Sequence, residues 1–229
     1  VWYTLANQMA EPPTHRYYHP QDGALMEAHQ VRKPHERTRQ RIFSVCSVIL
    51  VCLSVSASGF TADHASDIWK ALASGGSVAL LRHALAPGTG DPPEFRLGDC
   101  TTQRNLSDEG RDQASRIGDR FRENGIHGAR VFSSQWCRCL ETARLLKLGA
   151  VAELAPLNSF FSQFERRALQ TEALRQWLGE QELDHPIVLV THQVNITALT
   201  GVYPDSGELV VIRRSETGDI QVIGTIETR

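Results

Sequence analysis

The 229-residue sequence lacks a strong charge of either sign, internal repeats and the glycine-rich motifs of several common enzyme classes. Its 24 basic and 26 acidic residues leave a formal net charge of -2, which excludes a dedicated nucleic-acid binder with a strongly basic face. No segment matches the P-loop or the Gly-x-Ser-x-Gly elbow of a serine hydrolase, so neither site is expected. The remaining composition, 41% hydrophobic and 22% charged, is typical of a soluble globular domain.

Cysteine is scarce: the chain has five, and Cys46 and Cys52 lie in an apolar run toward the N-terminus. In an oxidising compartment the other three would form one disulfide and leave one thiol. We therefore expect Cys100 to pair with either Cys137 or Cys139. A Cys-x-Cys metal site is the alternative, but no histidine lies beside it at a ligand spacing, so we expect no metal.

Residues 26–59 have the three parts of a secretory signal: a basic flank, a short apolar run at 42–55 and small residues at 56–59. The flank contains Arg32, Lys33, Arg37, Arg39 and Arg41. A buried core element is one alternative. An uncleaved membrane anchor is another, although the run is shorter than the ~20 apolar residues of a span. We expect a periplasmic or secreted protein that contacts the membrane only if the signal stays uncleaved.

Residues 1–25 contain scattered proline, histidine and tyrosine without a sustained period, which predicts a poorly ordered leader. Signals normally begin near the start of a protein, so Met26 is a candidate initiator and 1–25 an error in the assigned gene start. The folded domain is then expected at 60–229.

Beyond residue 60, strand and helix patterns alternate, which predicts a three-layer α/β/α sandwich with a mostly parallel central sheet. Two apolar runs, 77–81 and 187–190, are typical of strands covered on both faces. Further strands are expected at 131–132, 151–154, 208–212 and 221–226, the last two as an antiparallel pair at an edge. Helices are expected at 63–75, 107–125, after 133–134, at 166–178 and up to Gly201. The segment 84–100 is a long loop rich in proline and glycine, and loops of this length are usually functional.

Basic side chains follow three of the predicted strands where each strand ends. They are Arg82-His83, then Arg138 a few residues after Ser133-Ser134, and His192. The carboxyl ends of parallel strands meet at one edge of a sheet, so these residues are expected to converge there. Two imidazoles, two guanidiniums and a helix start at Ser134 suit a phosphoryl group, because guanidinium forks and free N–H groups match its oxygens.

These motifs resemble those of the histidine phosphatase superfamily, which has the phosphoglycerate mutase-like fold. The family's Leu-Arg-His-Gly corresponds to residues 81–84, and its Ser-Ser-x-x-x-Arg-x-x-x-Thr-Ala corresponds to 133–143. Its Val-x-His corresponds to 190–192, and the helix start at 105–110 is similar to its Leu-Thr-x-x-Gly. The resemblance spans roughly residues 77–226, nearly the whole predicted domain.

The resemblance implies a metal-independent phosphatase that needs no cofactor and acts on a small phosphorylated substrate. His83 would attack phosphorus and form a phosphohistidine that water then cleaves. Arg82, Arg138 and His192 would bind the phosphoryl oxygens and offset the charge of the transition state. By analogy with exported members of the superfamily, the expected substrates are phosphomonoesters such as envelope sugar phosphates.

Two positions depart from the family's pattern. Ala84 replaces a glycine, which is conservative unless that residue needs a positive φ. The general acid is missing, since Ser159 stands where mutase-type members have glutamate and Gln193 stands where the other branch has aspartate. The remaining candidate acids are Glu94, Asp91 and Glu165. Leaving groups of low pKa would need such an acid least. The alternative function is a phosphate-binding or regulatory module of the same fold that has lost efficient catalysis.

Overall fold

A single six-stranded sheet runs through the part of the chain that the computed structural model describes, residues 59–215 and 217–228. The strand order is β3-β2-β4-β1-β5-β6. The first four strands in that order are parallel to one another, whereas β5 and β6 are antiparallel to their neighbours. The strands are β1 Ser77–Arg82, β2 Arg130–Ser133, β3 Val151–Glu153, β4 Ile187–Thr191, β5 Leu209–Arg214 and β6 Ile220–Ile226.

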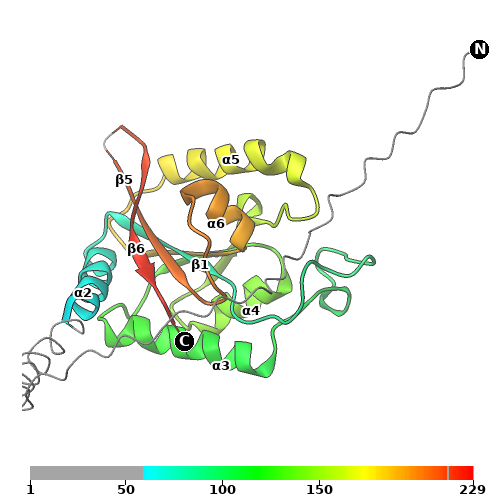
Figure 1. Ribbon diagram of the computed structural model, residues 1–229, viewed down its shortest axis with the longest axis horizontal. Coiled ribbons are helices and arrows are strands. Elements are labelled where there is room, and N and C mark those ends of the chain that lie inside the picture. The colour runs from blue at the N-terminus through cyan, green and yellow to red at the C-terminus, as the bar shows by residue number, and fades with distance from the viewer. Residues whose placement is uncertain (1–58, 216, 229) are drawn as a thin grey trace, which may run out of the picture. The chain divides into compact units, whose positions relative to one another are not determined.

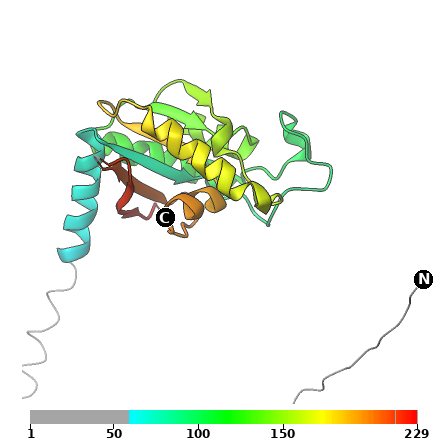
Figure 2. The same cartoon turned by 90° about the horizontal axis from the view of Figure 1, so that it is seen from above.

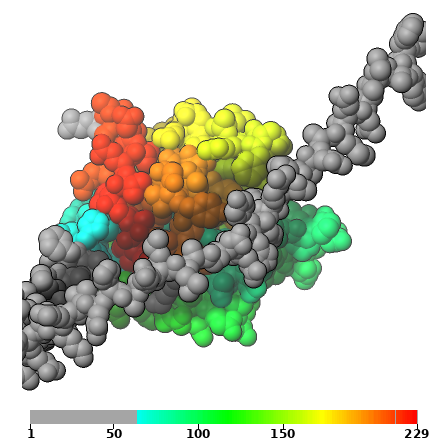
Figure 3. All heavy atoms as spheres, in the orientation of Figure 1, coloured from blue at the N-terminus to red at the C-terminus, as the bar shows by residue number. Residues whose placement is uncertain are grey.

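Helices cover both faces of the sheet, which confirms the predicted three-layer sandwich with a mostly parallel centre (Figure 1). Successive residues of a strand point to opposite faces. Val78 and Leu80 of β1 accordingly pack against α5 and α6, whereas Ala79 and Leu81 pack against α2, α3 and α4. In Figure 3, α5 and α6 lie next to each other on one surface. The helices are α2 Gly59–Ala73, α3 Asp108–Glu123, α4 Cys137–Leu145, α5 Arg167–Gly179 and α6 Gln193–Thr200.

The parallel register aligns the carboxyl ends of β1, β4 and β2. Arg82 pairs with Thr191, and Ser133 pairs with Val190. The N–H of His83 donates to the carbonyl oxygen of Thr191 at 2.9 Å, so the chain stays close to β4 just beyond the strand. The predicted basic segments therefore begin at one edge of the sheet. The long loop between β1 and α3 projects beyond that edge (Figure 2).

The end of this loop is fixed where α3 begins. The Ser107 hydroxyl accepts a hydrogen bond from the N–H of Gly110 at 3.1 Å and so caps the helix as expected. Gly110 lies so close to the loop that a Cβ on it would be 2.0 Å from the carbonyl oxygen of Leu85. Glycine at this position therefore lets the loop cross the start of α3, which holds both ends of the loop close to the sheet.

Some predicted element bounds were wrong. α4 begins at Cys137, not at Ser134, because the N–H of Ser134 still bonds to the carbonyl oxygen of Val190. The N–H of Cys137 is taken by the side-chain oxygen of Gln103 at 3.0 Å, so it is not free for an anion. α2 starts at Gly59, four residues before the predicted start. The predicted antiparallel pair at an edge is confirmed: β5 and β6 pair at one edge of the sheet, with β6 outermost because β5 also pairs with β1.

The predicted leader and almost all of the predicted signal, residues 1–58, lie outside the described residues. Among the helices that are described, none has the length and apolar character needed to cross a membrane.

Candidate active site

His83 lies directly after β1, and its side chain is almost fully buried. Its Nδ1 is 2.8 Å from the carbonyl oxygen of Ala84, which can only accept a hydrogen bond. Nδ1 therefore carries the proton of the neutral ring, and Nε2 keeps its lone pair. Burial, reinforced by the positive charge of Arg138, holds the pKa of His83 well below its usual value of 6.5. At neutral pH the ring is thus uncharged and has an imidazole nitrogen available for nucleophilic attack.

Ala84 occupies the position after His83 without backbone strain. In the described part of the chain Lys147 is the one non-glycine residue with a positive φ, so Ala84 does not need glycine's freedom. The N–H of Ala84 donates to the hydroxyl of Thr142 at 3.1 Å. This bond connects the segment that follows β1 to α4. It gives Thr142, a residue of the motif at 133–143, a structural role.

His192 precedes α6, and its ring lies edge-on to that of His83 with the centroids 5.5 Å apart. Its Nε2 is 2.8 Å from the hydroxyl of Ser134 and 3.5 Å from the thiol of Cys139. Burial, followed by the charge of Arg138, holds the pKa of His192 well below 6.5. Two neutral imidazoles therefore face one another, so one can attack phosphorus while the other donates a hydrogen bond.

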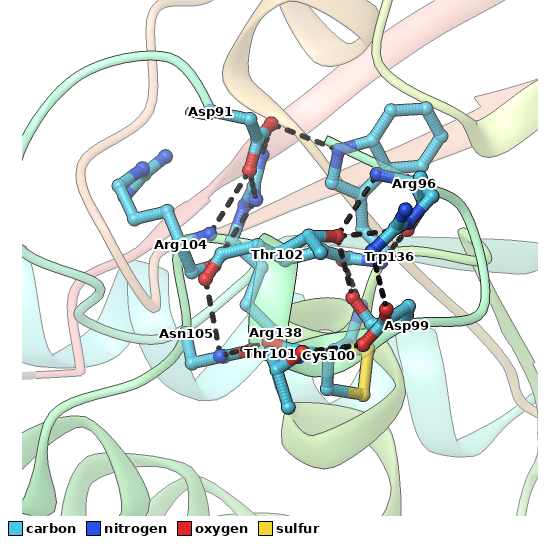
Figure 4. Close-up of a disulfide and its surroundings, with 12 residues drawn as sticks. Asp91, Arg96, Asp99, Cys100, Thr101, Thr102, Arg104, Asn105, Trp136 and Arg138 are labelled. Atoms are coloured by element: carbon cyan, nitrogen blue, oxygen red, sulfur yellow. Dashed lines mark hydrogen bonds and ion pairs between the residues drawn. A yellow bond between two sulfur atoms is a disulfide. The ribbon is translucent and has the colours of Figure 1, made fainter. Parts of the chain in front are cut away.

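Arg138 lies in the first turn of α4 and is only 2% exposed. Its Nη1 and Nη2 donate to the two carboxylate oxygens of Asp91 at 2.6 and 3.1 Å (Figure 4). Nη1 also donates to the carbonyl oxygen of Arg104 at 3.2 Å. The buried Nε has no hydrogen-bond partner in the described part of the chain. The protein thus holds the end of the guanidinium group and leaves its Nε donor for a ligand.

Two further guanidiniums accompany Arg138. Arg82 donates from Nη1 to the carbonyl oxygen of Pro204 at 2.9 Å, while its buried Nε lacks a partner among the described residues. Arg104 donates from Nε to the carbonyl oxygen of Gly90 at 2.7 Å. Burial and repulsion from Arg138 lower the pKa of Arg104 to about 10, so it stays charged at neutral pH. Arg104 is not among the residues predicted from sequence, where its only signal is its place between the long loop and the cap of α3.

These side chains line one cavity of about 180 Å³ beyond the carboxyl ends of the parallel strands. The charged groups in its lining are three guanidiniums and the Asp91 carboxylate. Both imidazoles are neutral, so three guanidiniums and one carboxylate give the cavity a net charge of +2. This charge is opposite and equal to that of a phosphomonoester dianion. The cavity is lined by Arg82, His83, Gly88, Thr89, Gly90, Asp91, Arg104, Arg138, Ser159, Phe161, His192, Gln193, Val194 and Tyr203.

The structure does not favour any of the three candidate acids. Asp91 is the one carboxylate that lines the cavity. Burial alone raises the pKa of Asp91, but hydrogen bonds and the charge of Arg138 bring it below its usual value of 3.8, so the group is anionic. Glu94 and Glu165 are exposed, and neither lines the cavity. Ser159, which stands in place of the family's glutamate, does line it.

The loop is tied covalently to the site. Cys100 pairs with Cys137 (S–S 2.07 Å, Cα–Cα 5.7 Å), next to Arg138 in sequence (Figure 4). Of the two predicted pairings, the structure therefore has the one with Cys137. Cys139 remains a buried free thiol, and burial raises its pKa to about 12.

Neither the neighbouring groove nor, in the described residues, a cluster of metal-binding side chains adds chemistry to the site. A groove of about 820 Å³ lies beside the disulfide, but neither histidine and none of the three guanidiniums described above lines it. In the parts of the chain that the structure describes, no three or more histidine, cysteine, aspartate or glutamate side chains gather where they could hold a metal ion.

The fold is an α/β sandwich, and its cavity gathers guanidiniums and imidazoles beyond the ends of the parallel strands. Residues 78–160 match the family described as histidine phosphatase superfamily (branch 1). The matched stretch contains Arg82, His83 and Arg138 and ends before His192. Over this stretch the chain is similar to the histidine phosphatases of that superfamily. A comparison with curated proteins found no match.

Several solved structures are similar to the chain. The protein histidine phosphatase SixA complexed with tungstate is 16% identical, and the alignment covers 66% of this chain and 97% of that one, with a TM-score of 0.47. Mycobacterial glucosyl-3-phosphoglycerate phosphatase is 17% identical, with 65% and 97% coverage and a TM-score of 0.47. A phosphoserine phosphatase mutant from Entamoeba histolytica, in complex with phosphoserine, is 15% identical, with 67% and 98% coverage and a TM-score of 0.46.

Proposed function

We propose that the protein is an exported, metal-independent phosphatase that hydrolyses phosphomonoesters through a phosphohistidine on His83. One arrangement carries the proposal: neutral His83, with its Nδ1 proton fixed on a backbone carbonyl, shares its cavity with two buried guanidinium Nε donors that have no partner among the described residues. A buried, unpaired N–H is costly unless a ligand satisfies it. A phosphoryl group supplies acceptor oxygens for both donors.

The reaction follows from this arrangement in two steps. Nε2 of His83 attacks phosphorus, a P–N bond forms, and the P–O bond to the alcohol breaks. The ring becomes positively charged, and its Nδ1–H stays bonded to the carbonyl oxygen of Ala84, which favours that charge. Arg82, Arg138 and His192 bind the equatorial oxygens of the loose transition state, with Arg104 as a third guanidinium. Water then cleaves the P–N bond, which releases phosphate and restores neutral His83.

Export is part of the proposal, and two features support it. The basic flank, apolar run and small residues of 26–59 have the order of a secretory signal. The Cys100–Cys137 disulfide is of a kind that persists in oxidising compartments. Sequencing the N-terminus of the protein from the cell envelope tests this. A mature end between residues 56 and 60 is expected, and peptides from 1–25 in the mature protein would contradict the predicted start.

The phosphohistidine is tested by trapping. Wild-type protein mixed with a 32P-labelled aryl phosphate and quenched should carry label that is stable in base and lost in acid. His83→Ala should carry none and should lose turnover. His185→Ala is the matched control, because His185 is exposed and does not line the cavity. Unlabelled wild type, or full turnover in His83→Ala, would contradict the proposal.

A second function, a phosphate-binding or regulatory module without efficient catalysis, is favoured by the lack of a protonated carboxyl in the cavity. It predicts that calorimetry detects binding of inorganic phosphate while a panel of aryl, acyl and sugar phosphates shows no turnover. Turnover of any of these phosphates that is lost in His83→Ala would contradict the binding module and support the phosphatase.

A further inference from the structure

The mouth of the active-site cavity has two exposed aromatic side chains. Phe161 is 46% exposed and Tyr203 is 74% exposed, and both line the cavity that contains His83. Large apolar side chains left in water beside a binding cavity usually mark a surface that a ligand covers. Phe161 and Tyr203 therefore are candidates for contact with the part of the substrate that extends out from the phosphoryl group.

Both aromatic residues are held next to the phosphate site by neighbouring contacts. The carbonyl oxygen of Pro204, the residue after Tyr203, accepts the hydrogen bond from Nη1 of Arg82. Phe161 follows Phe160, which is fully buried and anchors the segment. The Phe161 ring also lies against the loop, since its Cε1 is 3.8 Å from where a Cβ on Gly90 would be. The two side chains are thus positioned by the same groups that shape the phosphate cavity.

The lining also contains three neutral side chains that can form hydrogen bonds: Thr89, Ser159 and Gln193. The charged members of the lining are the three guanidiniums and Asp91, which pairs with Arg138. A leaving group at this mouth therefore meets aromatic faces and uncharged donors and acceptors. The cavity, at about 180 Å³, is below the several hundred Å³ of sites for drug-sized ligands, so it suits a phosphoryl group with one small ring.

The chemistry of the site restricts which oxygen can leave. With Asp91 anionic and Glu94 and Glu165 outside the cavity, no carboxyl group of the described residues is placed to protonate the departing oxygen. Such a site favours a leaving group that is stable as an anion. The anomeric hydroxyl of a sugar is more acidic than its other hydroxyls, because the ring oxygen withdraws electrons from it.

We propose that Phe161 and Tyr203, with the neutral groups of the lining, bind a single sugar ring, and that the substrates are sugars phosphorylated on the anomeric oxygen. The inference rests on the proposed phosphatase function and specifies its substrate. In the first step the P–N bond to His83 forms as the bond between phosphorus and the anomeric oxygen breaks. The departing oxygen takes its proton from water, and the product is the free reducing sugar.

The choice of oxygen is tested with glucose 1-phosphate and glucose 6-phosphate, which have the same atoms and charge. We expect kcat/KM to be at least about tenfold higher for glucose 1-phosphate, because a missing general acid costs poor leaving groups a factor on the order of 100 or more. Equal values, or a preference for glucose 6-phosphate, would overturn the anomeric assignment.

The sugar site is tested with Phe161→Ala, Tyr203→Ala and the double variant. We expect kcat/KM for glucose 1-phosphate to fall about tenfold or more in the double variant. The inhibition constant of inorganic phosphate should stay within about twofold, since phosphate does not reach the mouth. Phe164→Ala is the matched control, because Phe164 is 57% exposed but does not line the cavity.

The outcomes separate this inference from the proposed function. An active wild type whose sugar phosphate kinetics do not change in the double variant contradicts the sugar site and leaves the phosphatase intact. A wild type that forms no phosphohistidine with any phosphate contradicts both. An equal loss in Phe164→Ala would show that the effect does not come from the cavity, and would also overturn the sugar site.

Discussion

The carboxylate of Asp91 binds both terminal nitrogens of Arg138, at 2.6 and 3.1 Å, in a pair whose side chains are 17% and 3% exposed. Asp91 belongs to the long loop and Arg138 to α4, so the pair fixes the loop beside the cavity that contains His83. The carboxylate binds the two terminal nitrogens of the guanidinium and leaves Nε without a partner in the part of the chain that is described. Asp91 therefore orients the guanidinium that we propose binds phosphate, and as an anion it has no proton to supply.

Replacing Asp91 with asparagine should separate catalysis from binding. The variant leaves the Arg138 guanidinium less firmly oriented, so we expect kcat to fall at least about tenfold. The cavity becomes more positive, so inorganic phosphate should bind at least as tightly as in wild type. Steady-state kinetics with phosphate as a competitive inhibitor measures both. Asp99→Asn, in the same loop but away from the cavity, is the control, and an unchanged or higher kcat in Asp91→Asn would contradict the positioning role.

The pH dependence of stability should come from the two buried histidines. Both have a folded-state pKa well below 6.5, so the unfolded chain takes up protons first as the pH falls. Stability is then full above about pH 6.5 and decreases below it, by up to about 1.4 kcal/mol per pH unit for each ring. Urea unfolding between pH 8 and pH 5 measures this. His83→Asn should make stability depend less on pH, whereas the exposed control His185→Asn should leave the dependence unchanged. A wild-type stability that stays constant down to pH 5 would contradict buried neutral rings.

Installing a carboxyl at position 159 should supply the missing acid. Ser159 lines the cavity, so Ser159→Glu places a protonatable group near the leaving oxygen. We expect kcat for glucose 6-phosphate to rise about tenfold or more and kcat for p-nitrophenyl phosphate to change little, because only poor leaving groups need the proton. Ser159→Gln has the same length without the proton and is the control. A rise of equal size in both variants, or for both substrates, would rule out acid catalysis as the cause.

The disulfide should contribute to stability. It closes a loop with a sequence separation of 37 residues, for which the chain-entropy estimate is about 4 kcal/mol. Urea unfolding of Cys100→Ser should therefore show a clearly lower midpoint than wild type. A reductant should lower the wild-type midpoint to a similar value and should leave the variant unchanged. A wild-type midpoint that is insensitive to a reductant would count against this bond.

The sequence predicted the layers of the fold because apolar runs and amphipathic periods are local properties of the chain. The runs at 77–81 and 187–190 became the central strands β1 and β4, and the Ser107 cap starts α3 where expected. The convergence of His83, Arg138 and His192 in one cavity also follows from sequence, since residues after parallel strands meet at one sheet edge.

Only the tertiary structure decided what surrounds these residues. The pairing of Cys100, the ion pair of Asp91 and the presence of Arg104 in the cavity depend on how the long loop folds back onto α4. That loop contains no strand and only one short turn of helix, so no periodic pattern fixes its path. Its conformation follows from contacts with residues far away in sequence. Sequence alone therefore determined the fold and the convergence of His83, Arg138 and His192, whereas the packing of the loop decided the charge of the cavity and which cysteines pair.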